Sequence, residues 1–201
     1  MKLYGMPGSG NCYKVAWMLS VLDMRCEIVS VDTSKGQTKA PEFLSKNPAG
    51  QVPLLELDNE KRLSESNAIL LYIAEKGGKL LPDDAWQRAQ VYQWLFFEQY
   101  SHEPTIAVRR ANFKFNKGFS EEKLQDLLER GNKALAVMEK QLEQSPFLAG
   151  SELSVADMSL YAYTHVAQEG EYDLSVYPNI QAWIERVKTS DNYVGMEVLE
   201  I

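Results

Sequence analysis

The chain contains little cysteine and no long apolar run. Cys12 and Cys26 are the only cysteines among 201 residues, and they form no C-x-x-C motif. Together with only two histidines, they give no cluster with the spacing of metal ligands, so we expect no metal site. We expect reduced thiols, with a disulfide between them as the less favoured alternative. No stretch of about 18 apolar residues occurs, so no transmembrane helix is expected.

A secretory signal is also missing, because the start MKLYGMPGSG has no apolar stretch followed by a small-residue cleavage site. We therefore expect a cytoplasmic protein. Basic residues are fewer than acidic ones, and the net charge of −7 argues against nucleic acid or an anionic membrane as the main partner. Residues 1–80 hold 10 basic and 9 acidic residues, against 11 and 19 in the rest. A small anionic ligand is therefore repelled less by the first part.

The first 80 residues alternate between strand and helix patterns. The expected elements are a strand over 2–6, an amphipathic helix around 15–22, a strand over 26–31, a short helix over 41–46, a hairpin of 53–57 and 61–63, and a helix capped by Ser66. This order, β-α-β-α-β-β-α, is the thioredoxin-like layout. We expect an α/β thioredoxin-like domain over residues 1–76.

The rest of the chain is predicted to be helical. Residues 77–82 (GGKLLP) break the pattern, so we expect a linker over 77–84 and an all-α domain over 85–201. Its first long helix is predicted to place Ala89, Tyr92, Phe96 and Tyr100 on one face, and Pro104 should kink or interrupt it. Ser154 and Asp157 have capping-box spacing, which indicates a structural role.

The loop after the first strand carries Pro7-Gly8-Ser9-Gly10-Asn11-Cys12, just before a helix. Backbone N–H groups at such a helix start form an anion site. Where a thioredoxin-like redox motif has its leading thiol, this chain has the Ser9 hydroxyl. Ser9 could donate a hydrogen bond to an external thiolate or simply cap the helix. Asn11 could be a turn residue, and Cys12 a reactive thiol or a small buried residue, which is the favoured interpretation.

Two further segments fit a peptide ligand. In NPAGQVPLLEL, a cis bond between Val52 and Pro53 would turn the Val52 backbone outward to pair with an extended peptide. The alternative is an ordinary proline at the start of an edge strand. In Ser64-Glu65-Ser66, a carboxylate could hold a ligand amine, while Ser66 and the helix start could hold a ligand carboxylate. The alternative there is a plain helix cap.

Together with FLAGSELSVADMSL, these segments resemble the cytosolic glutathione transferase superfamily, in its bacterial serine/asparagine-loop branch, over nearly the whole chain. The resemblance implies a thioredoxin-like domain followed by an all-helical one, usually in a homodimer. It implies that glutathione binds as a co-substrate, with no cofactor and no metal. The implied reaction is transfer of glutathione to a small hydrophobic electrophile. Alternatives are a glutathione-dependent peroxidase or disulfide reductase, and a non-catalytic scaffold.

The resemblance also assigns residues. Ser9 would donate a hydrogen bond to the glutathione sulfur with help from Asn11, and Tyr4 ranks below Ser9 because it lies within the predicted strand. It implies Lys39 and Gln51 at the glycyl end, and Val52 and Pro53 at the cysteinyl backbone. It implies Glu65 and Ser66 at the γ-glutamyl end. Candidates to line the electrophile pocket are Tyr100, His102, Ile106 and Arg109, with core packing as the alternative.

Overall fold

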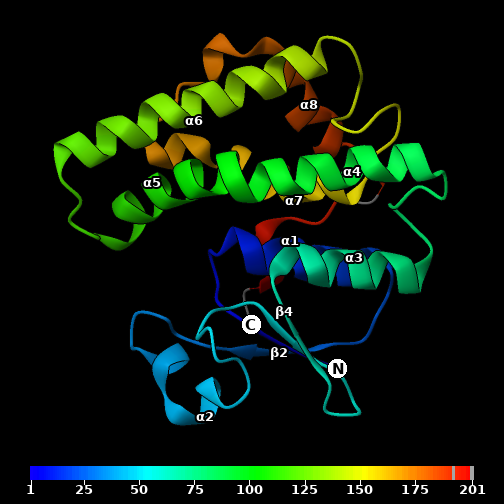
Figure 1. The fold of residues 1–201 in the computed structure, drawn as a ribbon, viewed down its shortest axis with the longest axis vertical. Coiled ribbons are helices and arrows are strands. Elements are labelled where there is room, and N and C mark those ends of the chain that lie inside the picture. Colours follow the sequence, from blue (N-terminus) through cyan, green and yellow to red (C-terminus); the bar gives the residue numbers. More distant parts are fainter. Residues whose placement is uncertain (192, 200–201) are drawn as a thin grey trace. The chain divides into compact units, whose positions relative to one another are not determined.

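The computed structural model describes residues 1–191 and 193–199, which form two compact units (Figure 1). The first unit contains Met1–Lys79 with the described part of Asp191–Ile201, and the second contains Leu80–Ser190. Residues 85–201 were all predicted to belong to the helical domain. Residues 193–199 instead pack on α1 (Gly10–Val21), where the Tyr13 hydroxyl donates to the Val194 carbonyl over 2.6 Å. Tyr193 also contacts Trp17 edge to face.

A four-stranded mixed sheet forms the centre of the first unit, in the order β2-β1-β3-β4. The strands are β1 (Lys2–Gly5), β2 (Glu27–Ser30), β3 (Leu54–Glu56) and β4 (Arg62–Ser64). β1 runs parallel to β2 and antiparallel to β3, and β4 runs antiparallel to β3. The predicted β-α-β unit and the predicted hairpin are therefore both present.

Helices cover both faces of this sheet (Figure 1). On one face, α1 packs beside α3 (Ser66–Gly77). On the other lies the short α2 (Pro41–Leu44), which follows the one-turn η1 (Gln37–Lys39) and contributes Phe43 to a core with Tyr4, Val31 and Leu54. Because strand side chains alternate, Tyr4 points away from the face on which its neighbour Leu3 is buried.

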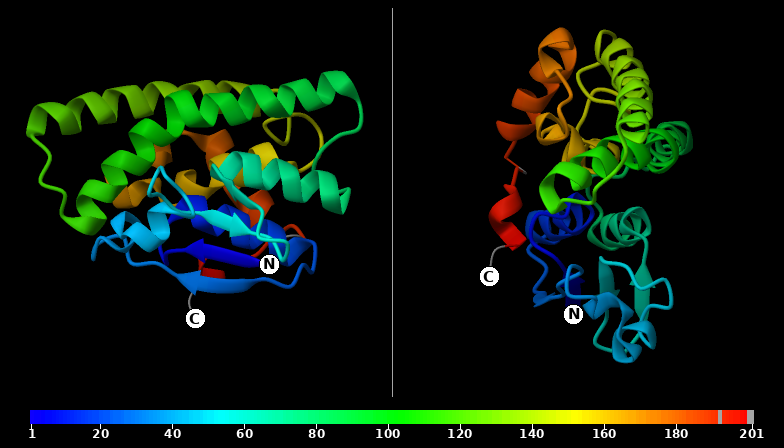
Figure 2. Two further views of the ribbon diagram at one scale, coloured as in Figure 1. Left: turned by 60° about the horizontal axis from the view of Figure 1, so that its bottom comes forward. Right: turned by 90° about the vertical axis from the view of Figure 1, so that its left-hand side faces the viewer.

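The second unit is built from helices. They are α4 (Ala85–Phe97), η2 (Glu98–His102), α5 (Glu103–Phe115), α6 (Glu121–Leu142), α7 (Val155–Thr164), η3 (Ala167–Gly170), η4 (Leu174–Val176) and α8 (Pro178–Lys188). Figure 2 shows α6 running beside α5, and their contacts make this pair one layer of the unit. Across the described ranges 1–191 and 193–199, no helix has the length and apolar character needed to cross a bilayer.

Pro104 was predicted to kink or interrupt the α4–α5 helix, but the helix continues and changes its hydrogen-bond pattern just before the proline. Residues Glu98–His102 form a π-helical turn, and Pro104 occupies the start of α5. A proline has no N–H to donate, and its ring collides with the carbonyl four residues earlier, here that of Tyr100. The wider π turn accommodates the proline and lets the helix continue.

The face predicted to carry Ala89, Tyr92, Phe96 and Tyr100 is largely exposed. Phe96 is 74% exposed and Tyr100 is 84% exposed, whereas Val91, Trp94 and Leu95 are buried. Trp86, ten residues before Phe96 in the same helix, is also 73% exposed. Two apolar stripes thus follow this helix, and periodicity alone does not decide which one faces the core.

Asp157 has the structural role that its spacing predicted. Its carboxylate is fully buried and completes a capping box with Ser154 at the start of α7. The same carboxylate accepts hydrogen bonds from the Leu148 backbone N–H at 2.9 Å and the Trp183 indole N–H at 3.0 Å. It therefore connects the start of α7, the preceding turn and α8.

Candidate glutathione site

Three loops of the first unit leave the sheet at the same end. In the strand register, Tyr4 pairs with Leu54, and Leu54 pairs with Ser64. Since β1 exits there, β3 enters there and β4 exits there, the segments 6–9, 51–53 and 65–66 lie side by side. Neighbouring strands are about 4.8 Å apart, so these loops span roughly 10 Å. That is the length of an extended tripeptide at about 3.5 Å per residue.

Ser9 caps α1, and this role does not prevent it from acting on a ligand. Its side-chain oxygen accepts a hydrogen bond from the Cys12 backbone N–H at 3.3 Å. The bond uses a lone pair of the hydroxyl and leaves the O–H as a donor. Ser9 is half-buried, so its hydroxyl lies at the surface of the loop beside the helix N-terminus.

Asn11 lies in the first turn of α1 and contacts the third loop. The Ser66 hydroxyl donates to its side-chain carbonyl oxygen over 3.1 Å. With that oxygen engaged, the Asn11 amide N–H groups face away from Ser66. The structure therefore brings together two predicted residues that lie 55 positions apart in the sequence.

Cys12 is a packed thiol rather than a nucleophile. Its side chain is completely buried against Gly5, and burial raises its pKa to about 11. At neutral pH it is therefore held as the protonated thiol. Both Cys12 and Cys26 are free of any disulfide. The favoured interpretation of Cys12 as a small buried residue agrees with these facts.

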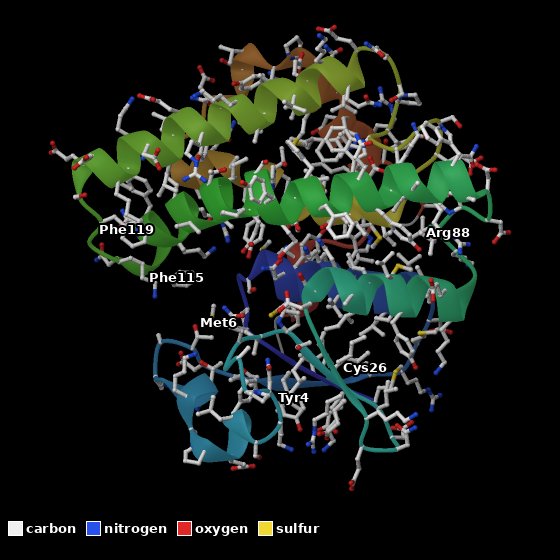
Figure 3. The ribbon with its side chains drawn as sticks, viewed as in Figure 1. Tyr4, Met6, Cys26, Arg88, Phe115 and Phe119 are labelled. Carbon is white, nitrogen blue, oxygen red and sulfur yellow. The ribbon has the colours of Figure 1, made fainter. Side chains whose placement is uncertain are left out.

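Tyr4 lies on the face of the sheet that α2 covers, opposite the face covered by α1 and α3 (Figure 3). Its hydroxyl donates to the Glu56 carboxylate at 3.3 Å, and its ring packs edge-on against Phe43. The Lys46 ammonium lies 5.4 Å above the same ring. Arg62 holds the pKa of Glu56 below its usual value through a 2.7 Å ion pair, so the carboxylate that accepts from Tyr4 stays charged. Tyr4 is thus committed to this network.

The peptide bond between Val52 and Pro53 is cis. The edge-strand alternative does not apply, because β3 lies between β1 and β4 and is an inner strand. Val52 precedes the strand and is half-buried. Buried Asn47 shapes the loop, since its amide donates to the Gln51 carbonyl at 2.8 Å and its side-chain oxygen accepts from the Ala49 N–H at 3.2 Å.

Lys39 supports the same loop from the other side. Its ammonium donates to the carbonyls of Ala49 and Gly50, at 3.3 and 2.9 Å. Gly50 has a φ of +61°, and a Cβ there would come within 2.9 Å of the Thr38 carbonyl oxygen. A glycine is therefore required at this close approach. Gln51, the other residue predicted for the glycyl end, is exposed at the loop tip.

Glu65 and Ser66 form the junction between β4 and α3. Glu65 is exposed and has a φ of +67°, which is unusual for a residue with a side chain. Such backbone strain is concentrated at functional sites. Ser66 is the first residue of α3, and Glu65 is the N-cap residue without a side-chain cap bond, so the prediction that Ser66 caps the helix is wrong. The first amides of α3 have no intrahelical partner to bond.

The four residues predicted to line the electrophile pocket do not share one accessible surface. Tyr100 is exposed, whereas His102 and Ile106 are fully buried and Arg109 is 5% exposed. The His102 ring nitrogen Nε2 lies 2.8 Å from the Thr164 hydroxyl.

Arg109 is occupied by structural bonds. Its guanidinium donates to the carbonyls of Gly170 and Leu124 and forms a 2.7 Å ion pair with Glu171. It therefore links α5 to the start of α6 and to the turn after η3. The helical spacing used for the prediction fails here because the π turn shifts the phase of every later residue.

Sequence reasoning missed three polar residues that shape the site. Asn47, Lys14 and Asn67 are all buried within the first unit. Asn47 and Asn67 belong to segments that carry the predicted site, but nothing in the spacing marks their roles. In the part of the chain that the structure describes, no group of three or more His, Cys, Asp or Glu side chains is arranged to hold a metal ion.

The fold and the three loops define a thioredoxin-like ligand-binding unit joined to an all-helical unit. Comparison with known families gives a match to "Glutathione S-transferase, N-terminal domain" over residues 1–75 and to "Glutathione S-transferase, C-terminal domain" over residues 92–191. The chain belongs to the glutathione S-transferase family.

Individual relatives agree with this assignment. The chain is 50% identical to a glutathione S-transferase structure from Pseudomonas fluorescens Pf-5, with a TM-score of 0.92, covering 97% of this chain and 98% of that one. It is 37% identical to rice "Probable glutathione S-transferase GSTF2", covering 91% of this chain and 89% of the relative. It is also 31% identical to Escherichia coli "Disulfide-bond oxidoreductase YfcG", covering 93% and 89%. Relatives of this family support glutathione transferase activity in general.

Proposed function

We propose that this chain is an enzyme that binds reduced glutathione along the three loops and transfers it to a hydrophobic electrophile. The observation that carries the proposal is the register Tyr4–Leu54–Ser64, which aligns the loops at one end of the sheet. In this proposal glutathione is a co-substrate, and the reaction uses no resident cofactor or metal.

The cysteinyl part of glutathione lies in the middle of the site. The Val52 backbone, next to the cis bond, pairs with it as a short added strand. At one end, the Glu65 carboxylate holds the γ-glutamyl ammonium, and the start of α3 at Ser66 holds its carboxylate. At the other end, Lys39 and Gln51 meet the glycyl carboxylate, and Lys39 has three donors, two of which serve loop carbonyls.

This arrangement brings the sulfur to Ser9, whose O–H donates to the thiolate while its lone pair keeps the cap on α1. A free thiol has a pKa near 8.5, so lowering it by about two units requires roughly 2.7 kcal/mol. A charge-assisted hydrogen bond and a helix N-terminus together supply an energy of this size. Asn11, two residues after Ser9, assists through its amide N–H. The thiol proton passes to solvent water, so no protein general base is needed. The thiolate then forms an S–C bond with the electrophile, and the displaced group leaves as its anion, which is chloride for a chlorinated nitroaromatic.

We further propose a homodimer that works in the cytoplasm. The exposed Trp86, Phe96 and Tyr100 lie along one side of the α4–η2 helix and supply an apolar surface for a second copy. A reducing compartment fits the two free cysteines.

Calorimetric titration with glutathione tests binding, and assays with a chlorinated nitroaromatic and with a mixed disulfide test the reaction. We expect glutathione binding, conjugation of the nitroaromatic, and a loss of about 100-fold in conjugation rate for Ser9→Ala. Ser120→Ala is a matched control, because Ser120 caps α6 with the same 3.3 Å bond to the N–H three residues on. Absence of binding would leave only a scaffold, and turnover of the disulfide alone would favour the reductase alternative.

A further inference from the structure

A lysine is buried in α1 below the glutathione loops. Lys14 has no exposed surface, and its ammonium donates a 2.8 Å hydrogen bond to the side-chain oxygen of Asn67. Burying an ammonium is costly, and stability alone is often served as well by an apolar residue of similar size. The position of this bond in the fold therefore needs a reason.

Asn67 is the second residue of α3, directly after Ser66. On α1, Lys14 lies three residues after Asn11, on the same side of the helix. Two side-chain bonds thus connect the first turns of α1 and α3: Asn11 with Ser66 at 3.1 Å, and Lys14 with Asn67 at 2.8 Å. One bond is at the half-exposed surface of the site and the other is beneath it, because Asn11 is half-buried and Lys14 is fully buried.

Each of these helix starts carries one part of the proposed site. The Ser9 loop leads into α1, and Glu65 leads into α3. The distance between the two helix starts therefore sets the distance between the group that meets the sulfur and the groups that meet the γ-glutamyl end. A shift of about 1 Å between such groups is enough to reduce a reaction rate by around two orders of magnitude.

We infer that Lys14 and Asn67 are positioning residues that fix the spacing between the thiolate loop and the γ-glutamyl loop. The inference rests on the proposed function, because it assigns these two loops to one ligand. Lys14 acts through Asn67 and α3, and neither side chain needs to touch glutathione.

The test compares Asn67→Ala, which removes the acceptor, with Asn67→Asp, which keeps an oxygen at the same place. A third variant, Lys14→Met combined with Asn67→Leu, replaces the whole pair by apolar side chains and keeps the core filled. Arg62→Met is the matched control, since it removes a cation and a 2.7 Å ion pair from β4 in the same unit. Readouts are glutathione Kd, the pKa of the bound thiol from its ultraviolet thiolate absorbance, kcat, and thermal unfolding.

Asn67→Ala and the double variant should weaken glutathione binding by about five- to tenfold, as expected for one lost charge-assisted bond, and should raise the pKa of the bound thiol. Asn67→Asp should restore both values, and Arg62→Met should leave them unchanged. Thermal unfolding of each variant separates a loss of glutathione binding from a loss of stability. The inference is overturned if Asn67→Ala and the double variant bind glutathione within about twofold of wild type with an unchanged thiol pKa. If wild type itself does not bind glutathione, the proposed function fails instead.

Discussion

The Ser66 hydroxyl donates a hydrogen bond to the Asn11 side-chain oxygen across 3.1 Å, joining two loops 55 residues apart in the sequence. The bond orients both groups before any ligand arrives. It turns the Asn11 amide N–H groups away from α3 and holds Ser66 at the α3 start. The part of the proposed site that meets the sulfur and the part that meets the γ-glutamyl end are therefore coupled through this contact.

Replacing Ser66 by alanine should affect binding more than chemistry. We expect Ser66→Ala to raise the glutathione Kd by about fivefold, because one hydrogen bond that orders the site is lost. The loss in kcat should be smaller than that of Ser9→Ala, since the hydroxyl is not placed at the sulfur. Steady-state kinetics at varied glutathione measures both. Ser45→Ala is the control, because the Ser45 hydroxyl donates to the Glu42 carbonyl in the same unit. An effect equal to that of Ser66→Ala would contradict the assignment.

The buried thiol of Cys12 predicts a specific dependence of stability on pH. Its folded pKa of about 11 lies above the ordinary value of 9.0, so between these values the native state keeps a proton that the unfolded chain releases. The contribution of Cys12 to the free energy of unfolding is complete below pH 9 and is lost as the pH rises toward 11. The loss amounts to about 3 kcal/mol.

Urea unfolding of wild type and Cys12→Ala at pH 8 and pH 10.5 measures this effect, and the stability difference between them should shrink at the higher pH. In Cys26→Ala, where Cys12 is the single remaining thiol, alkylation at neutral pH should require denaturant. Rapid labelling of the native Cys26→Ala protein would refute the burial argument.

Gly50 provides a test of the loop that leads to the cis bond. Gly50→Ala places a Cβ 2.9 Å from the Thr38 carbonyl oxygen and adds strain at a φ of +61°, so we expect a loss of about 2 kcal/mol and weaker glutathione binding. Gly36→Ala is matched to it, because Gly36 has a φ of +72° but open space around its Cβ position. The control should lose only the strain contribution, about 1 kcal/mol, and should bind glutathione normally. Equal effects in both would mean that the close approach is unimportant.

The exposed aromatic residues of α4 lie where we propose the dimer interface, so a charged substitution there should disrupt the dimer. Phe96→Asp puts a charge on a surface that we propose faces a second copy, so sedimentation should show a shift from dimer to monomer. Val176→Asp alters another exposed apolar residue, 64% exposed on η4, and should leave the assembly unchanged. A dimer that persists in Phe96→Asp would place the interface elsewhere.

Local motifs allowed the fold and the candidate site of the first unit to be predicted from the sequence. Val52-Pro53 and Glu65-Ser66 flank a hairpin, and the ends of antiparallel strands meet, so their proximity follows from topology. The face of α4 could not be read, since Phe96 and Trp94 belong to two competing apolar stripes. Lys14 was missed because a lysine within an apolar helix segment is ordinarily read as exposed. Residues 193–199 carry no periodic signal for their contact with α1.

That last contact has a consequence for how the chain is completed. The contacts of Val194 with Tyr13 and of Tyr193 with Trp17 can form only after the whole helical unit has been synthesised. Because the ribosome synthesises the chain from its N-terminus, the glutathione-binding unit lacks this contact on α1 until residues 193–199 have been synthesised. Residues 1–79 expressed by themselves would form this unit without the contact that residues 193–199 make with α1. A fusion that ends the chain directly after residue 190 would lack the same contact.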